Sequence, residues 1–82
     1  QNYPNPFNPI TKINFSIPSD SKVKLDVYDI SGKLVATLIN NEIKTANYYS
    51  IEFNGANYSS GTYFYTLQSG GIVVTKKMVL LK

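Results

Sequence analysis

Apolar and polar residues alternate along most of this chain, in short runs separated by residues typical of turns. Between Thr11 and Ile17, for example, Ile13, Phe15 and Ile17 alternate with polar residues, which is the period of a half-buried strand. The runs predicted as strands are 11–17, 22–28, 34–39, 48–53, 61–68 and 72–81. No segment has a helical period. The pattern therefore predicts an all-β, antiparallel sandwich of two packed sheets.

The alternation also predicts which side chains form the core. The predicted core positions are Ile13, Phe15, Ile17, Val23, Leu25, Val27, Tyr49, Ile51, Phe53, Tyr63, Tyr65 and Leu67. Asp26 falls on the opposite face of its run and is predicted to be a solvent-exposed partner of the neighbouring lysines. Such a surface ion pair contributes only about 0–1 kcal/mol, so it decides little about the fold.

Turn residues predict the connections. Asp29 begins the turn 29–33, where its carboxylate can accept local backbone N–H groups and Gly32 can adopt a positive φ. A metal-binding or catalytic role for Asp29 is the alternative, but no second acid lies nearby in the sequence. Residues 40–47 are polar and are predicted to connect two sheet elements, and residues 69–71 are predicted to form a tight hairpin turn.

The first nine residues form a proline-rich arm. Proline fixes φ and lacks a backbone donor, so this segment cannot be a central strand, and polyproline character is expected. The arm residues expected to dock are Tyr3, Pro4, Pro6, Phe7 and Pro9, with Tyr3 and Phe7 as the aromatic anchors. We expect one domain over residues 1–82: residues 1–9 as an arm or linker that packs along the edge of the sandwich, and residues 10–82 as the sandwich.

The composition argues against catalysis and metal binding. The 82 residues contain no cysteine and no histidine, which removes the thiolate nucleophile, the commonest general base and the commonest metal ligands. The acids are scattered singly along the chain. No catalytic, metal-binding or cofactor-binding residue is therefore expected, and the chain is not expected to be an enzyme. It has no run of about 18 apolar residues, so no membrane-spanning segment is expected.

The net charge of +3 comes from eight lysines and no arginine. Lysine cannot make the bidentate contacts by which arginine reads guanine or phosphate, and these lysines are not gathered into one stripe. A solubilising surface is therefore favoured over nucleic-acid binding.

Several motifs occur in order along the chain: Tyr3–Pro9, Val27–Val35, Phe53–Gly55, Ser60–Leu67 and Lys76–Lys82. Together they resemble the type A C-terminal sorting domain of the type IX secretion system. The resemblance implies a seven-stranded immunoglobulin-like sandwich that directs a passenger protein through the outer-membrane machinery, after passage through the periplasm, for surface attachment or release. It implies the translocation and sortase machinery and an upstream passenger domain as partners. The motifs also resemble the immunoglobulin-like domain of the flagellar hook-capping protein.

The same resemblance implies that the end of the chain is read by the secretion machinery. The residues it singles out are Gly61, Tyr63, Lys76, Lys77, Met78, Val79, Leu80, Leu81 and Lys82. We expect a receptor to pair with the edge of the last hairpin, assisted by the charges of Lys76, Lys77 and Lys82. The alternative is that these lysines only protect an edge strand from aggregation.

Two other functions stay open at this point. A glycan-binding accessory module would use exposed tyrosines such as Tyr48 or Tyr58, although the lack of tryptophan weakens this hypothesis. A structural spacer or self-assembling surface subunit would dock its arm, residues 3–9, on a neighbouring copy. All these hypotheses place the protein outside the cell or on its surface.

Overall fold

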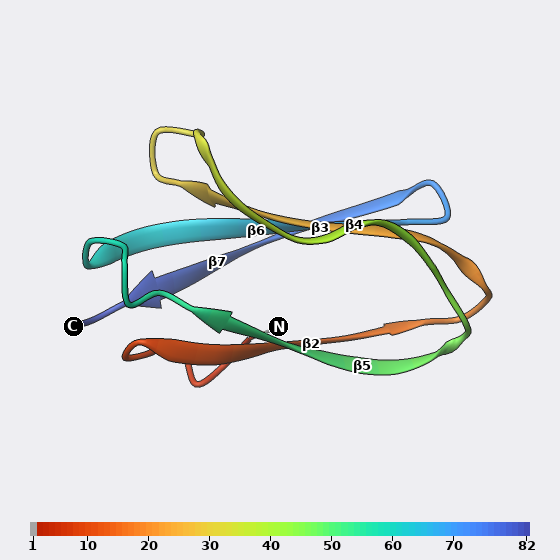
Figure 1. Cartoon of the computed structure of the whole chain (residues 1–82), viewed down its shortest axis with the longest axis horizontal. Helices are drawn as coiled ribbons and strands as arrows, with labels where there is room; N and C mark the ends of the chain where they lie inside the picture. Colours follow the sequence, from red (N-terminus) through yellow and green to blue (C-terminus); the bar gives the residue numbers. More distant parts are fainter. Residues whose placement is uncertain (1) are drawn as a thin grey trace.

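The computed structural model describes residues 2–82, and within them every regular element is a strand (Figure 1). The strands are β1 (Asn2–Tyr3), β2 (Ile10–Ile17), β3 (Ser21–Asp29), β4 (Leu34–Lys44), β5 (Asn47–Asn54), β6 (Gly61–Ser69) and β7 (Ile72–Leu80). They form a three-stranded sheet of order β1-β2-β5 and a four-stranded sheet of order β4-β3-β6-β7. All strand pairs are antiparallel. The predicted all-β sandwich is confirmed.

The core lies between the two sheets, as the alternation predicted. Val23, Leu25 and Val27 of β3 are fully buried, and the tyrosines and leucine of β6 that pair beside them are at most 9% exposed. The three-stranded sheet contributes Ile13, Ile17 and Phe53 to the same cluster, while Phe15, Tyr49 and Ile51 pack against it only partly buried. Burial of apolar area at about 25 cal/mol per Å² is the main force that holds the layers together.

Strand β4 is longer than predicted, and the prediction of a connection over residues 40–47 is wrong for most of that segment. Residues 40–44 continue β4, so that Lys44 pairs with Ser21 at the start of β3. The register shifts between Val23 and Leu25, and Asn41 opposite has a φ of 54°. The bulge, with Asn41 in the left-handed region, lets β4 continue through polar residues. Hydrophobic alternation does not predict this part of the strand.

Asp26 is buried, which corrects the prediction of an exposed surface pair. Its side chain is 3% exposed, accepts a hydrogen bond of 2.8 Å from the Thr37 hydroxyl, and lies 3.7 Å from the Lys24 ammonium. The carboxylate is therefore part of the packed outer layer of the four-stranded sheet rather than a free surface charge.

The proline-rich arm crosses from one sheet to the other. Asn2 and Tyr3 pair with β2 as the short strand β1, and Phe7 then forms a parallel bridge with Leu80 at the end of β7. Between these two contacts the chain bends at residues 4–6, so the arm is not the polyproline segment that was predicted. In the structure the arm lies against strands of both sheets.

Candidate recognition surface

The last hairpin is built by a two-residue turn between β6 and β7. Gly70 and Gly71 have φ values of 55° and 81°, and Ser69 pairs with Ile72 across them. A turn with positive φ at both central positions matches the twist of the flanking strands, and glycine adopts it without strain. The predicted hairpin is confirmed, and it makes β7 the edge strand of the four-stranded sheet.

The outer edge of β7 is occupied only near its C-terminal end. The Phe7 N–H donates to the Val79 carbonyl at 2.9 Å, and the Leu81 N–H donates to the Phe7 carbonyl at 2.9 Å. Asn5 adds two bonds: its Oδ1 accepts the Val79 N–H at 2.9 Å and its Nδ2 donates to the Lys77 carbonyl at 3.4 Å. The arm therefore pairs with β7 from Lys77 onward and leaves the preceding part of the edge open.

The covered end of β7 is locked into the core. Met78 and Leu80 are fully buried, Phe7 is 1% exposed, and the Phe7 ring meets Phe53 edge-on at 6.0 Å. Gly55 completes this packing: an added Cβ would lie 3.0 Å from Leu80 and 3.3 Å from the Phe7 ring. This half of β7 is a structural anchor, because the molecule could not keep its core without it.

The other half of β7 is exposed on both faces. Ile72 and Val73 are 60% and 62% exposed, although both are apolar and lie in an edge strand. Alternation along the strand turns the N–H groups of Val73, Thr75 and Lys77 outward, the same direction as those of Val79 and Leu81. Among residues 2–82, no backbone group pairs with Val73 or Thr75 on that side. We call Ile72–Lys77 the open half of β7.

A shallow apolar groove lies beside the open half. It has a volume of about 130 Å³ and runs between the end of β2 and the last hairpin. Its lining includes Ile17, Pro18, Leu67, Ile72 and Val74. Lys76 lies on the same face of β7 as Met78 yet is exposed, so the three-stranded sheet does not extend over this part of the strand. Backbone donors, apolar side chains and a groove thus lie together.

The residues singled out for recognition divide into two groups. Tyr63, Met78 and Leu80 are buried, and the Tyr63 hydroxyl donates to the Ser59 carbonyl at 2.7 Å. Gly61 has a φ of 150°, which allows the backbone to enter β6 after the preceding loop. These residues build the hairpin and hold it in place.

The rest of the group lies at the surface. Lys76, Lys77 and Leu81 are exposed, and Val79 is half-buried. Lys82 is held by the preceding loop, because its ammonium donates to the Ala56 and Tyr58 carbonyls at 2.7 and 3.0 Å. The ammonium groups of Lys76 and Lys77 form no ion pair within residues 2–82, and they are the charges of this group that remain available to a partner.

The arm residues also divide. The Phe7 side chain is 1% exposed, whereas the Tyr3 side chain is 77% exposed and only its backbone pairs with β2. Pro4 contributes its carbonyl, which accepts the Thr11 hydroxyl at 2.8 Å. Pro6 and Pro9 flank Phe7, and the Pro9 carbonyl accepts the Gly55 N–H at 2.7 Å. Sequence reasoning missed Asn5, whose only sequence signal is a polar side chain held between two prolines.

Asp29 forms the predicted turn. Its Oδ1 accepts hydrogen bonds from the Ser31 hydroxyl at 2.6 Å, the Ser31 N–H at 2.9 Å and the Lys33 N–H at 3.0 Å. The Ser31 hydroxyl, followed by the Lys33 N–H, lowers the pKa of this carboxyl below its ordinary value. Gly32 has a φ of 87° in the same turn. The carboxylate is occupied by Ser31 and Lys33 of its own turn.

The remaining hypotheses concern metal ions, glycans and the membrane. Within residues 2–82 no three histidine, cysteine, aspartate or glutamate side chains come together as metal ligands would. Tyr58, named for the glycan hypothesis, stacks on Phe53 at 5.8 Å and donates to the Val35 carbonyl at 3.0 Å. Tyr48 is 84% exposed, with no second exposed aromatic stacked on it. In residues 2–82 no helix has the length and apolar character needed to cross a membrane.

These features define a class: a small antiparallel β-sandwich that presents a half-open edge strand. The sequence matches the family described as the secretion system C-terminal sorting domain over residues 1–81, and the chain belongs to this family. It is therefore a C-terminal sorting signal of the type IX secretion system, a module of secreted or cell-surface proteins that interacts with the secretion machinery. The family is not an enzymatic one.

A solved structure supports the fold. The chain is similar to an uncharacterized protein from Bacillus anthracis str. Ames, whose crystal structure was determined at 1.4 Å, with 15% sequence identity and a TM-score of 0.67. The match covers 92% of this chain and 73% of that one. At this identity the likeness shows the sandwich architecture alone. No curated protein matches the sequence.

Proposed function

We propose that the type IX outer-membrane machinery recognises this domain by adding a strand to the open half of β7, Ile72–Lys77. The observation that carries the proposal is the division of β7: the arm of the same chain covers the edge from Lys77 onward, while the outward N–H groups of Val73 and Thr75 stay unpaired. An edge strand with free backbone groups is the usual template for strand addition.

The side chains of the open half fit the same interpretation. Proteins protect an edge strand by placing charge, proline or a bulge on it, because an exposed apolar edge promotes aggregation. Here Ile72, Val73 and Val74 are 60%, 62% and 37% exposed beside the apolar groove. A receptor strand would bond to the backbone and place alternate side chains in the groove, which gives affinity and selectivity together.

Lys76 and Lys77 would act at longer range. They lie on opposite faces of β7 and are both exposed, so they favour an acidic receptor from either side. Exposed charges of this kind raise the rate of association more than the final affinity. The alternative, that they only protect the edge, does not account for the three apolar residues that precede them.

The remaining parts of the hypothesis concern the whole secreted protein. Residues 1–82 act as one folding unit, with residues 1–9 serving both as the linker to an upstream passenger and as the partner of β7. The passenger crosses the periplasm, the machinery binds the sorting domain, and a sortase then removes it near the arm for surface attachment or release. The recognition residues that contact the machinery are those of the open half, while Gly61, Tyr63 and Met78–Lys82 hold the hairpin in shape.

The change Thr75→Pro tests the proposal. Proline removes the outward N–H of Thr75, whereas the ladder between β7 and β6 uses the neighbouring residues, so the sandwich should stay folded. With the domain fused to the C-terminus of a reporter in a bacterium that uses type IX secretion, we expect export to fall by about tenfold or more, the loss typical of a central interface contact.

Ser50→Pro is the matched control, because it removes an outward N–H from the edge strand β5 of the other sheet. The Gly55 N–H bonds to Pro9 of the β2 side, and alternation along β5 turns the Ser50 N–H away from β2. This variant should be exported normally. Normal export of Thr75→Pro, with both variants shown to be folded by circular dichroism, would refute strand addition at the open half.

A further inference from the structure

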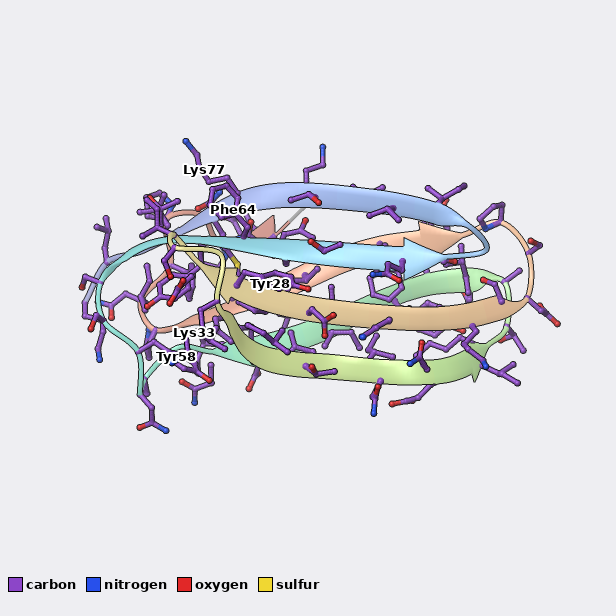
Figure 2. All side chains as sticks on the ribbon, turned by 90° about the horizontal axis from the view of Figure 1, so that it is seen from above. Tyr28, Lys33, Tyr58, Phe64 and Lys77 are labelled. Atoms are coloured by element: carbon purple, nitrogen blue, oxygen red, sulfur yellow. The ribbon has the colours of Figure 1, made fainter. Side chains whose placement is uncertain are left out.

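An aromatic row crosses the outer face of the four-stranded sheet. Tyr28 of β3 pairs with Phe64 of β6, and Phe64 pairs with Lys77 of β7, so the three side chains lie side by side on one face. Figure 2 looks onto this face and shows Tyr28, Phe64 and Lys77 in a row across the strands. Lys33 lies near the same end of the molecule, on the other side of Tyr28 from Lys77. Leu34 of β4 pairs with Tyr28 and extends the row to the other edge of the sheet.

The core does not require this row. Val27 and Tyr65, the neighbours of Tyr28 and Phe64 along their strands, point inward and are buried, and the outward positions next to them need only be compatible with a strand. Tyr28 and Phe64 are nevertheless large and half-buried, Leu34 is 49% exposed, and Ile30 in the adjoining turn is 73% exposed. A contiguous apolar area on the outer face of a sandwich marks an interaction site.

Two lysines flank the row. Lys33 and Lys77 lie at its two ends and are exposed, and neither forms an ion pair within residues 2–82. The acids of this region are occupied by the protein itself: Asp26 is buried under the Thr37 hydroxyl, and Asp29 is held by its own turn. The face therefore presents an aromatic and aliphatic centre with a positive rim at Lys77, while the charge of Lys33 is partly balanced by the nearby Asp29 carboxylate.

We propose that this face, defined by Tyr28, Phe64, Leu34, Lys33 and Lys77, is a second docking surface for the secretion machinery and binds an acidic protein surface with an apolar centre. Aromatic residues dominate the buried centres of protein interfaces, and complementary rim charges orient the partner. The inference rests on the proposed function, because Lys77 ends both the row and the open half of β7. One partner could pair with the edge and cover the adjoining face.

Binding of the whole chain to the purified type IX outer-membrane machinery tests this inference. We expect Phe64→Thr and Tyr28→Thr each to raise the dissociation constant by about tenfold or more, as loss of an interface centre does. Threonine suits a strand, so the fold should persist, and thermal unfolding checks this. Lys77→Glu and Lys33→Glu should mainly slow association, and their effect should shrink as salt is added.

Two variants outside the face are the matched controls. Tyr48→Thr removes a tyrosine that is 84% exposed on β5 of the other sheet, and Lys12→Glu reverses a charge on β2. Both should bind like the wild type. Unchanged affinity of Phe64→Thr and Lys77→Glu would overturn the second surface.

Thr75→Pro separates this inference from the proposed function. If Thr75→Pro loses binding while Phe64→Thr and Lys77→Glu keep it, strand addition stands and the face has no role. If the wild-type chain does not bind the machinery, both proposals fall. If the same face variants instead lose binding to vesicles that carry lipopolysaccharide, the face serves an anionic glycan, and the protein partner proposed here is overturned.

Discussion

The two halves of strand β7 differ in burial and in the pairing of their outer edge. From Met78 to Leu80 the strand is buried among Phe7, Phe53 and Tyr63, and the arm occupies its outer edge. From Ile72 to Lys77 every residue is exposed, and among residues 2–82 the outer edge is unpaired until the Lys77 carbonyl, which accepts the Asn5 side-chain amide. One strand therefore both holds the sandwich together and presents an edge to a partner.

This difference changes how the end of the chain should be tested. Deleting the last seven residues removes Lys76 and Lys77, but it also removes Met78 and Leu80, which are fully buried. Loss of export after such a deletion could follow from unfolding alone. Only changes confined to one half of β7 separate the stability of the fold from recognition.

Phe7→Ala is the change with the largest expected effect, because it removes the side chain that packs under the covered half of β7. The side chain is 1% exposed and packs on Phe53 beside Leu80, so its loss leaves a cavity under the covered half and weakens the packing that holds the arm against β7. We expect the free energy of unfolding to fall by about 3–5 kcal/mol, measured by urea denaturation. The control Tyr3→Ala, in the same arm but 77% exposed, should change it by less than about 0.5 kcal/mol. Equal losses from the two changes would contradict the anchoring role of Phe7.

The sandwich and its core could be predicted because alternation in a strand reports directly which face each side chain takes. Val23, Leu25 and Val27 follow this rule and are all fully buried. The rule fails at residues 40–44, where a bulge continues β4 through polar positions. It also fails at Asp26, because its burial depends on side chains of the adjoining strands that surround it.

The division of β7 could not be predicted from the sequence. It depends on Asn5 and Phe7, which bond to residues near the opposite end of the chain, and no local pattern records such a contact. The resemblance named the residues from Lys76 onward as one group. The structure divides them, because Lys76 and Met78 lie on the same face of β7 and only Met78 is covered by the other sheet.

Two tyrosines of β6, Tyr63 and Tyr65, lie beside the boundary between the covered and the open half of β7. Tyr65 lies opposite Lys76, where coverage ends, and its buried hydroxyl has no hydrogen-bond partner; burial raises the pKa of this phenol. Tyr63 lies opposite Met78, in the covered half, and its hydroxyl donates to the Ser59 carbonyl at 2.7 Å. Two buried tyrosines of one strand thus differ in whether the hydroxyl is satisfied.

Tyr65→Phe should therefore stabilise the domain by roughly 1 kcal/mol, because it removes a buried donor that has no acceptor. Tyr63→Phe should destabilise it by about 1 kcal/mol, because it removes a satisfied hydrogen bond and leaves the Ser59 carbonyl without its partner. Urea denaturation of both variants measures the difference. A loss of stability in Tyr65→Phe as large as that in Tyr63→Phe would show that the Tyr65 hydroxyl is hydrogen-bonded in solution.

The smallest expected effect is on the pH dependence of the melting temperature. Neither half of β7 carries a carboxylate, so this effect is expected from a site outside β7. The pKa of Asp29 is lowered in the folded state by the Ser31 hydroxyl and the Lys33 N–H. Its contribution to stability is therefore fully present above the unfolded-state pKa, about 3.9, and is lost as the pH falls through the lower folded-state value. Asp29→Asn should unfold at a lower temperature than the wild type at pH 7, and the gap should narrow as the pH falls below the unfolded-state pKa.

The control for this titration is Glu52→Gln, which removes an exposed carboxylate from β5 instead of one that caps a turn. If the hydrogen bonds of the turn are the cause, the pH-dependent difference in melting temperature from the wild type should be large in Asp29→Asn and much smaller in the control. A gap of equal size in both variants would trace it to the net charge of the molecule instead. Lys76→Ala and Lys77→Ala should leave the fall of the melting temperature at low pH unchanged, since neither change removes a carboxylate. An effect limited to Asp29→Asn would assign that part of the acid sensitivity to the turn between β3 and β4.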